Sequence, residues 1–550
     1  MDTACHSSFG DVFGRGKAGS RWFMGEQSLI RLAGVVIAAG LMVPLLFSSV
    51  PPFCDLYFHI ARMVVLENPD GAYVRDWYAP DWHLIPNLAM DVIVPGLGKF
   101  MPLLTAARVF VALTLLLIFS GTVALHHALY RRLSWLPLLA ALFVYNQIVF
   151  FGYFNYLFGV GAALWASATW FYLQERPTSI RIAVASLCAI VLYACHFFAV
   201  GLFGLVIASS EIHRSVRDQS LGKHALLMSA PFLLPVILLL TSRTVEASDR
   251  TVEYLGIAKL LAIFTIFNTT NPPIDLYLVI AAAIFVGSLL FFRRAIQVSE
   301  QMRLAVILLP ILVFIMPTGI FGTFYADLRL PVAAIFFVIA ASRLREHMLL
   351  QVCAATIAMA LLILRLTALS IDFRVAGAEA DEIRTQFHAL TPGSVVFTAN
   401  LERKPFLLHA LVTPSQWNGL ADRVDTLPLD HFTTIALLDQ AVFVPQTLMI
   451  DGQQPARMKT PFDGLKALQA DALGTWSSFH EEHVLQGNGD LAKWVERIKA
   501  VVSQPPYKFA AIYVALVDPE GIGEIPGAKQ IYAGHGYRLW DVSTELSAGG

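Results

Sequence analysis

The sequence predicts a polytopic α-helical membrane protein with a small α/β domain after its last membrane span. Hydrophobic residues make up 56% of the 550 residues and charged residues only 14%, whereas an ordinary soluble domain has about 45–50% apolar and about 25% charged residues. Apolar runs recur between residues 29 and 369, many of them close to the roughly 20 residues that a helix needs to cross a bilayer. Beyond residue 370 charged residues return.

This composition also excludes several classes of protein. Too few polar residues are present to cover the surface of a soluble enzyme, and a disordered or collagen-like chain is excluded as well. Lys and Arg number 39 against 40 Asp and Glu, so no electrostatic attraction to nucleic acid is expected. The five cysteines are scattered. We interpret them as small hydrophobic residues, without a disulfide framework or zinc-ligand spacing.

The apolar runs predict about eleven membrane spans, several of them short. They lie near residues 29–50, 103–127, 135–151, 154–173, 180–195, 197–212, 224–242, 274–292, 304–321, 329–342 and 347–368.

The distribution of basic residues predicts the orientation of these spans. The N-terminal segment, residues 1–28, contains Arg15, Lys17 and Arg21 and is therefore placed in the cytoplasm. If residues 180–212 form two short helices with a break near Cys195-His196, the basic clusters of all the alternate loops face the cytoplasm too. The membrane domain then covers residues 29–370. Its long first loop, 51–102, and the C-terminal domain, 371–550, lie on the outer side.

The C-terminal domain has the pattern of a small α/β fold. Residues 393–397 and 509–516 are typical of buried strands. Residues 491–502 have helical periodicity, with Leu491, Trp494 and Ile498 on one face. No phosphate-binding loop, nucleophile elbow or metal-ligand spacing is present. A lid that packs over the membrane domain or guides substrate is therefore the simplest interpretation.

The start of the first outer loop carries the best candidate for chemistry. Asp55, His59 and Arg62 are spaced i, i+4 and i+7, which predicts one polar face of a short helix. A carboxylate there can deprotonate a hydroxyl group or bind a divalent cation, and an arginine can bind a phosphate. The alternative is an interfacial amphipathic helix whose polar face only meets water.

The rest of this loop is rich in aromatic and polar residues. Asp76, Asp81, His83 and Asn87 lie among Trp and Tyr side chains. Aromatic faces beside carboxylates and amides suit sugar rings, so we expect these four residues to bind substrate. Anchoring in the headgroup region of the bilayer explains the aromatic residues equally well.

Further polar residues lie on the outer half of the spans. They are Asn155, His196, Tyr325, Asp327 and Arg329. Polar groups at such positions usually face a cavity or a partner, so we predict that these five converge on one outward-facing substrate site. Interhelical hydrogen bonds explain Asn155 and His196 as well, and a local ion pair explains Asp327 and Arg329.

Two stretches resemble motifs of a known family. One is Asp55-Leu56-Tyr57-Phe58-His59-Ile60-Ala61-Arg62, and the other is Phe151-Gly152-Tyr153-Phe154-Asn155-Tyr156-Leu157-Phe158-Gly159. Residues 441–445 and 452–455 show a weaker likeness. Together with the predicted architecture, these stretches resemble a bacterial branch of the GT-C glycosyltransferases. That superfamily includes protein O-mannosyltransferases, lipid A aminoarabinose transferases and oligosaccharyltransferases.

The resemblance implies a GT-C-like fold and a role for one residue. Family members take a sugar from a polyprenyl-phosphate donor outside the cytoplasm, and the first-loop carboxylate is a general base or metal ligand. On this chain that role falls on Asp55, His59 is the second candidate catalytic residue, and a divalent cation is the one candidate cofactor. Arg62 and Arg329 are candidates for the donor phosphate by their chemistry alone. Many members carry a second acidic residue close by, whereas Asp55 is followed by Leu56.

The leading hypothesis is therefore a bacterial inner-membrane glycosyltransferase. Its partners would be the lipid-linked sugar, a lipid, polysaccharide or protein acceptor, and the surrounding membrane lipids. A carrier or flippase for a lipid-linked glycan is the first alternative, although it requires polar residues in both leaflets and the inner half is almost free of charge. A non-catalytic envelope assembly protein is the second alternative.

Overall fold

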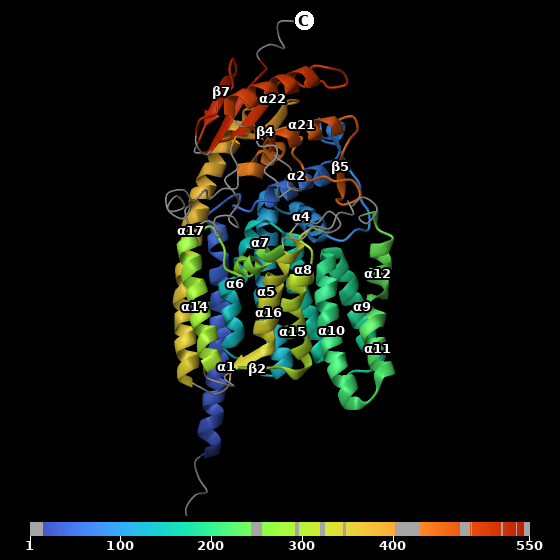
Figure 1. Cartoon of the computed structure of the whole chain (residues 1–550), viewed down its shortest axis with the longest axis vertical. Helices are drawn as coiled ribbons and strands as arrows, with labels where there is room; N and C mark the ends of the chain where they lie inside the picture. Colours follow the sequence, from blue (N-terminus) through green and yellow to red (C-terminus); the bar gives the residue numbers. More distant parts are fainter. Residues whose placement is uncertain are drawn as a thin grey trace, which may run out of the picture.

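The structure is a computed structural model. It describes residues 15–243, 256–291, 296–319, 325–344, 348–401, 429–473, 485, 487–518, 521–534 and 536–543. A layer of roughly parallel helices forms one part of the molecule, and a four-stranded sheet with its helices lies at the end nearer the C-terminus (Figure 1). Helices α2 (Leu56–Glu67) and α4 (Ala89–Gly98) of the first loop lie between these two parts (Figure 1).

Helices occupy the regions in which spans are predicted. They are α1 (Arg15–Met42), α5 (Leu103–Tyr130), α8 (Phe154–Tyr172), α9 (Thr178–Cys195), α10 (Phe197–Asp218), α11 (Leu221–Ser229), α12 (Leu233–Leu240), α14 (Pro272–Phe291), α15 (Arg303–Ile315), α16 (Ala326–Ala341) and α17 (Met348–His388). The predicted span 135–151 is divided into η2 (Leu136–Ala140), α6 (Ala141–Val144) and α7 (Gln147–Phe150).

Six helical stretches within the described residues are long and apolar enough to cross a membrane. They are Gln27–Leu46, Leu103–Tyr130, Thr178–Cys195, Phe197–Asp218, Leu221–Leu240 and Val352–His388. The chain is therefore a multi-pass membrane protein. The other predicted spans coincide with helices that are shorter, interrupted or, in the case of α8, less apolar along their length, so the total of about eleven crossings stays a prediction.

The predicted break near Cys195-His196 is confirmed. Helix α9 ends at Cys195 and α10 begins at Phe197. His196 has extended backbone, and its Nδ1 accepts a hydrogen bond from the backbone N–H of Phe198 at 3.2 Å. This side-chain cap satisfies one of the free N–H groups at the start of α10. The histidine thus stabilises the interruption between the two helices.

Helix α17 connects the membrane part to the C-terminal domain without interruption. It runs for 41 residues from Met348 to His388, so position 371, the predicted domain boundary, lies inside it. In its later turns, Phe373, Ala380 and Phe387 are buried in the core. The change in composition near residue 370 therefore marks a change in the surroundings of one helix.

The C-terminal sheet has the strand order β4-β6-β8-β7. Its strands are β4 (Val395–Asn400), β6 (Ile512–Val517), β7 (Lys529–Ala533) and β8 (Tyr537–Asp541). β4 and β6 are parallel, and both pairs that involve β8 are antiparallel. The two strands expected from the sequence are β4 and β6, and both are buried along their whole length. Burial on both faces explains their nearly continuous apolar runs.

Helices α21 (Asp463–Leu473) and α22 (Gly487–Val502) pack on one face of this sheet. The predicted apolar face of α22 is confirmed, because Leu491, Trp494 and Ile498 are all buried. The opposite face of the sheet joins the core that continues into the membrane helices, through η7 (Leu429–Ile435) and the end of α17. The domain therefore packs directly against the membrane part.

The first loop and the C-terminal domain are also joined by strand pairing. β1 (Tyr78–Pro80), which follows α3 (Val74–Trp77), pairs antiparallel with β5 (Ala456–Met458). The Tyr78 hydroxyl donates to the carbonyl of Val444 at 2.9 Å and accepts from its N–H at 3.1 Å. These bonds fix the loop against the domain that covers it.

One expectation about the membrane helices needs correction. The half distant from the C-terminal sheet was expected to be almost free of charge. Instead, Arg181 donates to Glu211 at 2.5 Å, and His224 Nδ1 lies 2.6 Å from the second oxygen of Glu211. All three side chains are buried and come from α9, α10 and α11. Their mutual pairing lowers the cost of burying these charges. The sequence alone does not show this burial because it depends on how α9, α10 and α11 pack against one another.

Candidate active site

A cavity of about 670 Å³ lies where the first loop, the membrane helices and the C-terminal domain meet. Its apolar lining comes from α10, α12, α15 and the residue after α15. It includes Gly201, Leu202, Leu205, Leu239, Leu240, Leu309, Leu312 and Met316. Its polar lining includes Asp55, His59, Asn87, Asn155, His196, Tyr325, Arg329, His431, Gln453 and Gln454. The cavity therefore combines a hydrocarbon-like wall with groups that can bind a polar ligand.

The backbone around Asp55 is held by the second sequence motif. Asp55 precedes the first turn of α2, and its N–H donates to the carbonyl of Phe151 at 3.0 Å. Gly152 has a positive φ of 83°, and a Cβ atom added there would lie 2.7 Å from the Asp55 nitrogen. Only glycine permits this close approach. The two motifs that resemble the GT-C family thus contact each other in space.

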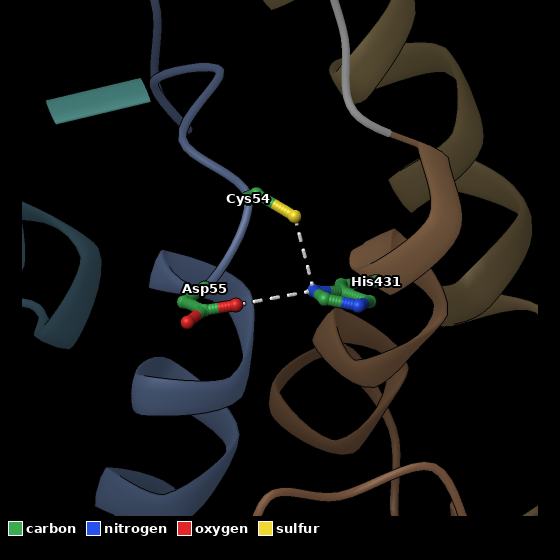
Figure 2. Close-up of side chains that lie close together, drawn as sticks. All are labelled: Cys54, Asp55 and His431. Atoms are coloured by element: carbon green, nitrogen blue, oxygen red, sulfur yellow. Dashed lines mark hydrogen bonds and ion pairs between the residues drawn. The ribbon is translucent and has the colours of Figure 1, made fainter. Parts of the chain in front are cut away.

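Asp55 lies beside Cys54 and His431 (Figure 2). His431 Nδ1 is 3.4 Å from Asp55 Oδ1 and 3.2 Å from Cys54 Sγ. The His431 ring packs on Phe58, with 4.0 Å between the ring centroids. Sequence reasoning missed His431 because it lies 377 residues from Cys54 and belongs to no spaced motif. Cys54 was interpreted only as a small hydrophobic residue, and its contact with His431 extends that interpretation.

His59 and Arg62 do not form the exposed polar face that the spacing suggested. Both are buried, because the C-terminal domain covers α2. Arg62 Nη2 lies 2.6 Å from His59 Nδ1, and Arg62 Nε donates to Asp91 Oδ1 at 2.5 Å. Burial, together with the nearby Arg62 charge, holds the pKa of His59 well below its usual range. His59 reaches the cavity lining, whereas Arg62 does not.

Arg329 lines the cavity from the first turn of α16. Its guanidinium carbon lies 4.1 Å from the centroid of the Tyr153 ring, a cation–π geometry. Its Nη1 is 3.3 Å from His196 Nε2, and the Tyr156 hydroxyl donates to the Arg329 carbonyl at 2.7 Å. Tyr325, just before α16, also lines the cavity. The expected convergence of His196, Tyr325 and Arg329 is therefore present.

Asp327 behaves differently from its neighbours. It is fully buried and does not line the cavity. Its Oδ2 accepts from the Thr318 hydroxyl at 2.7 Å, and its Oδ1 accepts from the N–H of Leu328 at 2.9 Å. These bonds give Asp327 a structural place at the start of α16.

Asn155 and Asn87 both line the cavity and contact each other. The Asn155 side chain accepts from the N–H of Met90 at 2.6 Å and donates to the carbonyl of Asn87 at 2.8 Å. Asn87 has a positive φ of 82°. Asn155 thus holds the backbone of the first loop in place beside the cavity.

The remaining predicted substrate residues lie outside the cavity lining. Asp76 is exposed, and Asp81 Oδ1 lies 3.0 Å from His83 Nε2. The backbone N–H of Asp81 donates to the carbonyl of Pro455 at 2.8 Å, just beyond the β1–β5 pair. Because this pairing holds the segment against the C-terminal domain, Asp76, Asp81 and His83 do not join the site around Asp55.

Comparison with known proteins agrees with this architecture. No family model and no curated protein matches the sequence. Among solved structures, the chain is similar to the crystal structure of ArnT from Cupriavidus metallidurans in the apo state, with a TM-score of 0.53 and 12% sequence identity. The match covers 96% of this chain and 98% of that one. The likeness shows that the two chains share a fold.

Proposed function

We propose that the protein is a glycosyltransferase that moves a sugar from a polyprenyl-phosphate donor to an acceptor hydroxyl. The observation that carries this proposal is one cavity in which the Asp55 carboxylate opens toward a wall of apolar side chains from the membrane helices. A donor with a lipid chain and a phosphate-linked sugar needs both features. The GT-C-like fold shared with ArnT supports the same class of reaction.

The two kinds of lining suggest how the donor is bound. Leu202, Leu205 and Leu309 offer an apolar surface to the first isoprene units. Arg329 and His196 offer N–H groups and, on the arginine, a positive charge to the phosphate. Arg62 is not proposed for this role because it is fully buried against Asp91.

Asp55 is proposed as the group that activates the acceptor. Its side chain is partly exposed at 20% and lines the cavity, so an acceptor hydroxyl can approach it. The acceptor oxygen forms a bond to the anomeric carbon, and the bond from that carbon to the phosphate oxygen breaks. Asp55 takes the hydroxyl proton, and polyprenyl phosphate leaves with the electron pair.

The proposed location is the bacterial inner membrane. The N-terminus would lie in the cytoplasm, and the first loop and C-terminal domain would lie in the periplasm, as the basic residues predict. The acceptor, whether lipid, polysaccharide or protein, would then approach from the periplasmic side.

The decisive experiment compares lipid-linked and transferred glycans in a deletion strain. The strain is complemented by the wild type, by Asp55→Asn or by Asp76→Asn, and the glycans are measured by mass spectrometry. Asp55→Asn should lose transfer by about 10²–10⁴-fold, while Asp76→Asn, at an exposed site outside the cavity, should behave as wild type. Equal product from Asp55→Asn at equal membrane abundance would refute the mechanism.

A further inference from the structure

We propose that Cys54, Asp55 and His431 bind a zinc ion at the edge of the cavity. Their ligand atoms all lie within 4.8 Å of one another. Zinc bonds of about 2.0–2.3 Å in a tetrahedron place neighbouring ligand atoms about 3.3–3.6 Å apart. The observed separations of 3.2 Å between Sγ and Nδ1 and 3.4 Å between Nδ1 and Oδ1 are close to this range. The third pair, Cys54 Sγ and the Asp55 carboxylate, is separated by at most 4.8 Å, so closing around the ion requires a shift of up to about 1 Å at one of these side chains.

The types of ligand favour zinc over magnesium or calcium. A cysteine thiolate and a histidine nitrogen are the ligands that zinc prefers, whereas magnesium and calcium take oxygen ligands. Cys54 and His431 are both buried. A buried thiolate beside a carboxylate is costly without a cation, so a bound zinc ion would stabilise both groups.

The backbone at Cys54 and Asp55 and the ring of His431 are held in position before any ion binds. The N–H groups of Cys54 and Asp55 donate to the carbonyls of Phe150 and Phe151 at 2.9 and 3.0 Å. The His431 ring is oriented by Phe58. Ligands held in this way lose little conformational entropy when the metal binds.

The site also has the composition of a reactive zinc centre. Three protein ligands leave a fourth position for water or substrate, and Cys54, Asp55 and His431 all line the cavity. Asp55 Oδ1 is the oxygen nearest His431 and would hold the ion, which would act as a Lewis acid and make an acceptor hydroxyl in the fourth position easier to deprotonate. This use of the ion rests on the proposed function, whereas the binding of the ion does not.

The test is metal analysis of the full-length protein purified in detergent. After chelator treatment and incubation with zinc, elemental analysis should find about one zinc per chain in the wild type. At limiting zinc, Cys54→Ser and His431→Ala should each retain at least tenfold less zinc than the wild type. The controls Cys188→Ser and His388→Ala change the same residue types outside the cluster and should retain the wild-type amount.

Cobalt provides a second measurement, and its first part uses only the wild-type protein. Cobalt-loaded wild type should show the charge-transfer absorption of a thiolate–cobalt bond, and Cys54→Ser should lose it. Absence of this absorption from the wild type, or unchanged zinc in Cys54→Ser, would overturn the proposal.

Loss of transfer in Asp55→Asn without zinc in the wild type would leave the proposed function standing. Zinc bound to a wild-type protein without transfer activity would support the metal site and would refute the proposed function.

Discussion

Arg62 and Asp91 form a fully buried ion pair that joins α2 to α4. The distance between Arg62 Nε and Asp91 Oδ1 is 2.5 Å, and neither side chain is exposed. Arg62 also contacts His59, which lines the cavity. The pair therefore fixes the helix that follows Asp55, and it explains why a conspicuous arginine of the first loop is absent from the cavity lining.

Breaking this pair should destabilise the protein strongly. Asp91→Asn leaves the Arg62 charge buried without its partner, which costs about 3–5 kcal/mol. The melting temperature of the purified protein should fall, and the double variant Arg62→Met/Asp91→Leu should recover part of the loss. Asp76→Asn, in an exposed pair with Arg75, is the control and should change little. Equal melting temperatures for wild type and Asp91→Asn would contradict this account.

His59 should make stability depend on pH. Its pKa in the folded protein is lowered by burial and by Arg62, whereas an unfolded histidine titrates near about 6.5. Below that pH the unfolded chain binds a proton that the folded chain does not, so stability falls as pH falls, by up to about 1.4 kcal/mol per pH unit. Melting temperatures between pH 7.5 and 5 should decline less steeply in His59→Gln. His388→Gln, at an exposed site, should keep the wild-type slope, and identical slopes in all three proteins would exclude His59 as the cause.

Gly152→Ala should reduce transfer without removing any polar group. The added Cβ would lie 2.7 Å from the Asp55 nitrogen and 2.8 Å from the Leu56 nitrogen, so the backbone of Asp55 must move. We expect a loss of about 100-fold, the size of effect that a displacement near 1 Å produces. Gly96→Ala, where an added Cβ meets nothing within 4 Å, is the matched control. Full activity in Gly152→Ala would show that the position of Asp55 is not critical.

Arg329 should affect binding of the donor more than binding of the acceptor. Replacing it by Gln removes charge-assisted hydrogen bonds to phosphate worth about 1.5–3 kcal/mol, so KM for the donor should rise about 10- to 100-fold. The donor KM of Arg329→Lys should lie between those of the wild type and Arg329→Gln, because lysine keeps the charge without the planar donor group. Arg497→Gln changes an exposed arginine of the C-terminal domain and should not alter KM. A changed acceptor KM alone would contradict the assignment.

The orientation of the chain is tested by labelling cysteines in intact cells. Asp70→Cys and Lys529→Cys place thiols at exposed positions of the first loop and the C-terminal sheet. An impermeant thiol reagent that has crossed the outer membrane should label both before the inner membrane is opened. Arg217→Cys, at the exposed end of α10, should be labelled only afterwards. Labelling in the reverse order would overturn the predicted sidedness.

The sequence predicted the positions of the helices well because apolar runs are a local signal. It also located the break at His196, the strands β4 and β6, and several residues that line the cavity, including Asp55, Asn155 and Arg329. It could not place His431 beside Asp55, because that contact depends on how a distant domain packs. The burial of Arg62 was missed for the same reason, since the polar face of α2 is covered by chain that follows the last membrane helix.

The cavity is lined by residues from the first loop, the membrane helices and the C-terminal domain. His431, Gln453 and Gln454 contribute part of its lining, and the β1–β5 pair connects their neighbourhood to the first loop. During synthesis, the membrane helices emerge from the ribosome well before these residues do. A nascent chain inserted in the bilayer thus lacks the complete cavity, and it gains one only when the residues that follow α17 have been synthesised and folded.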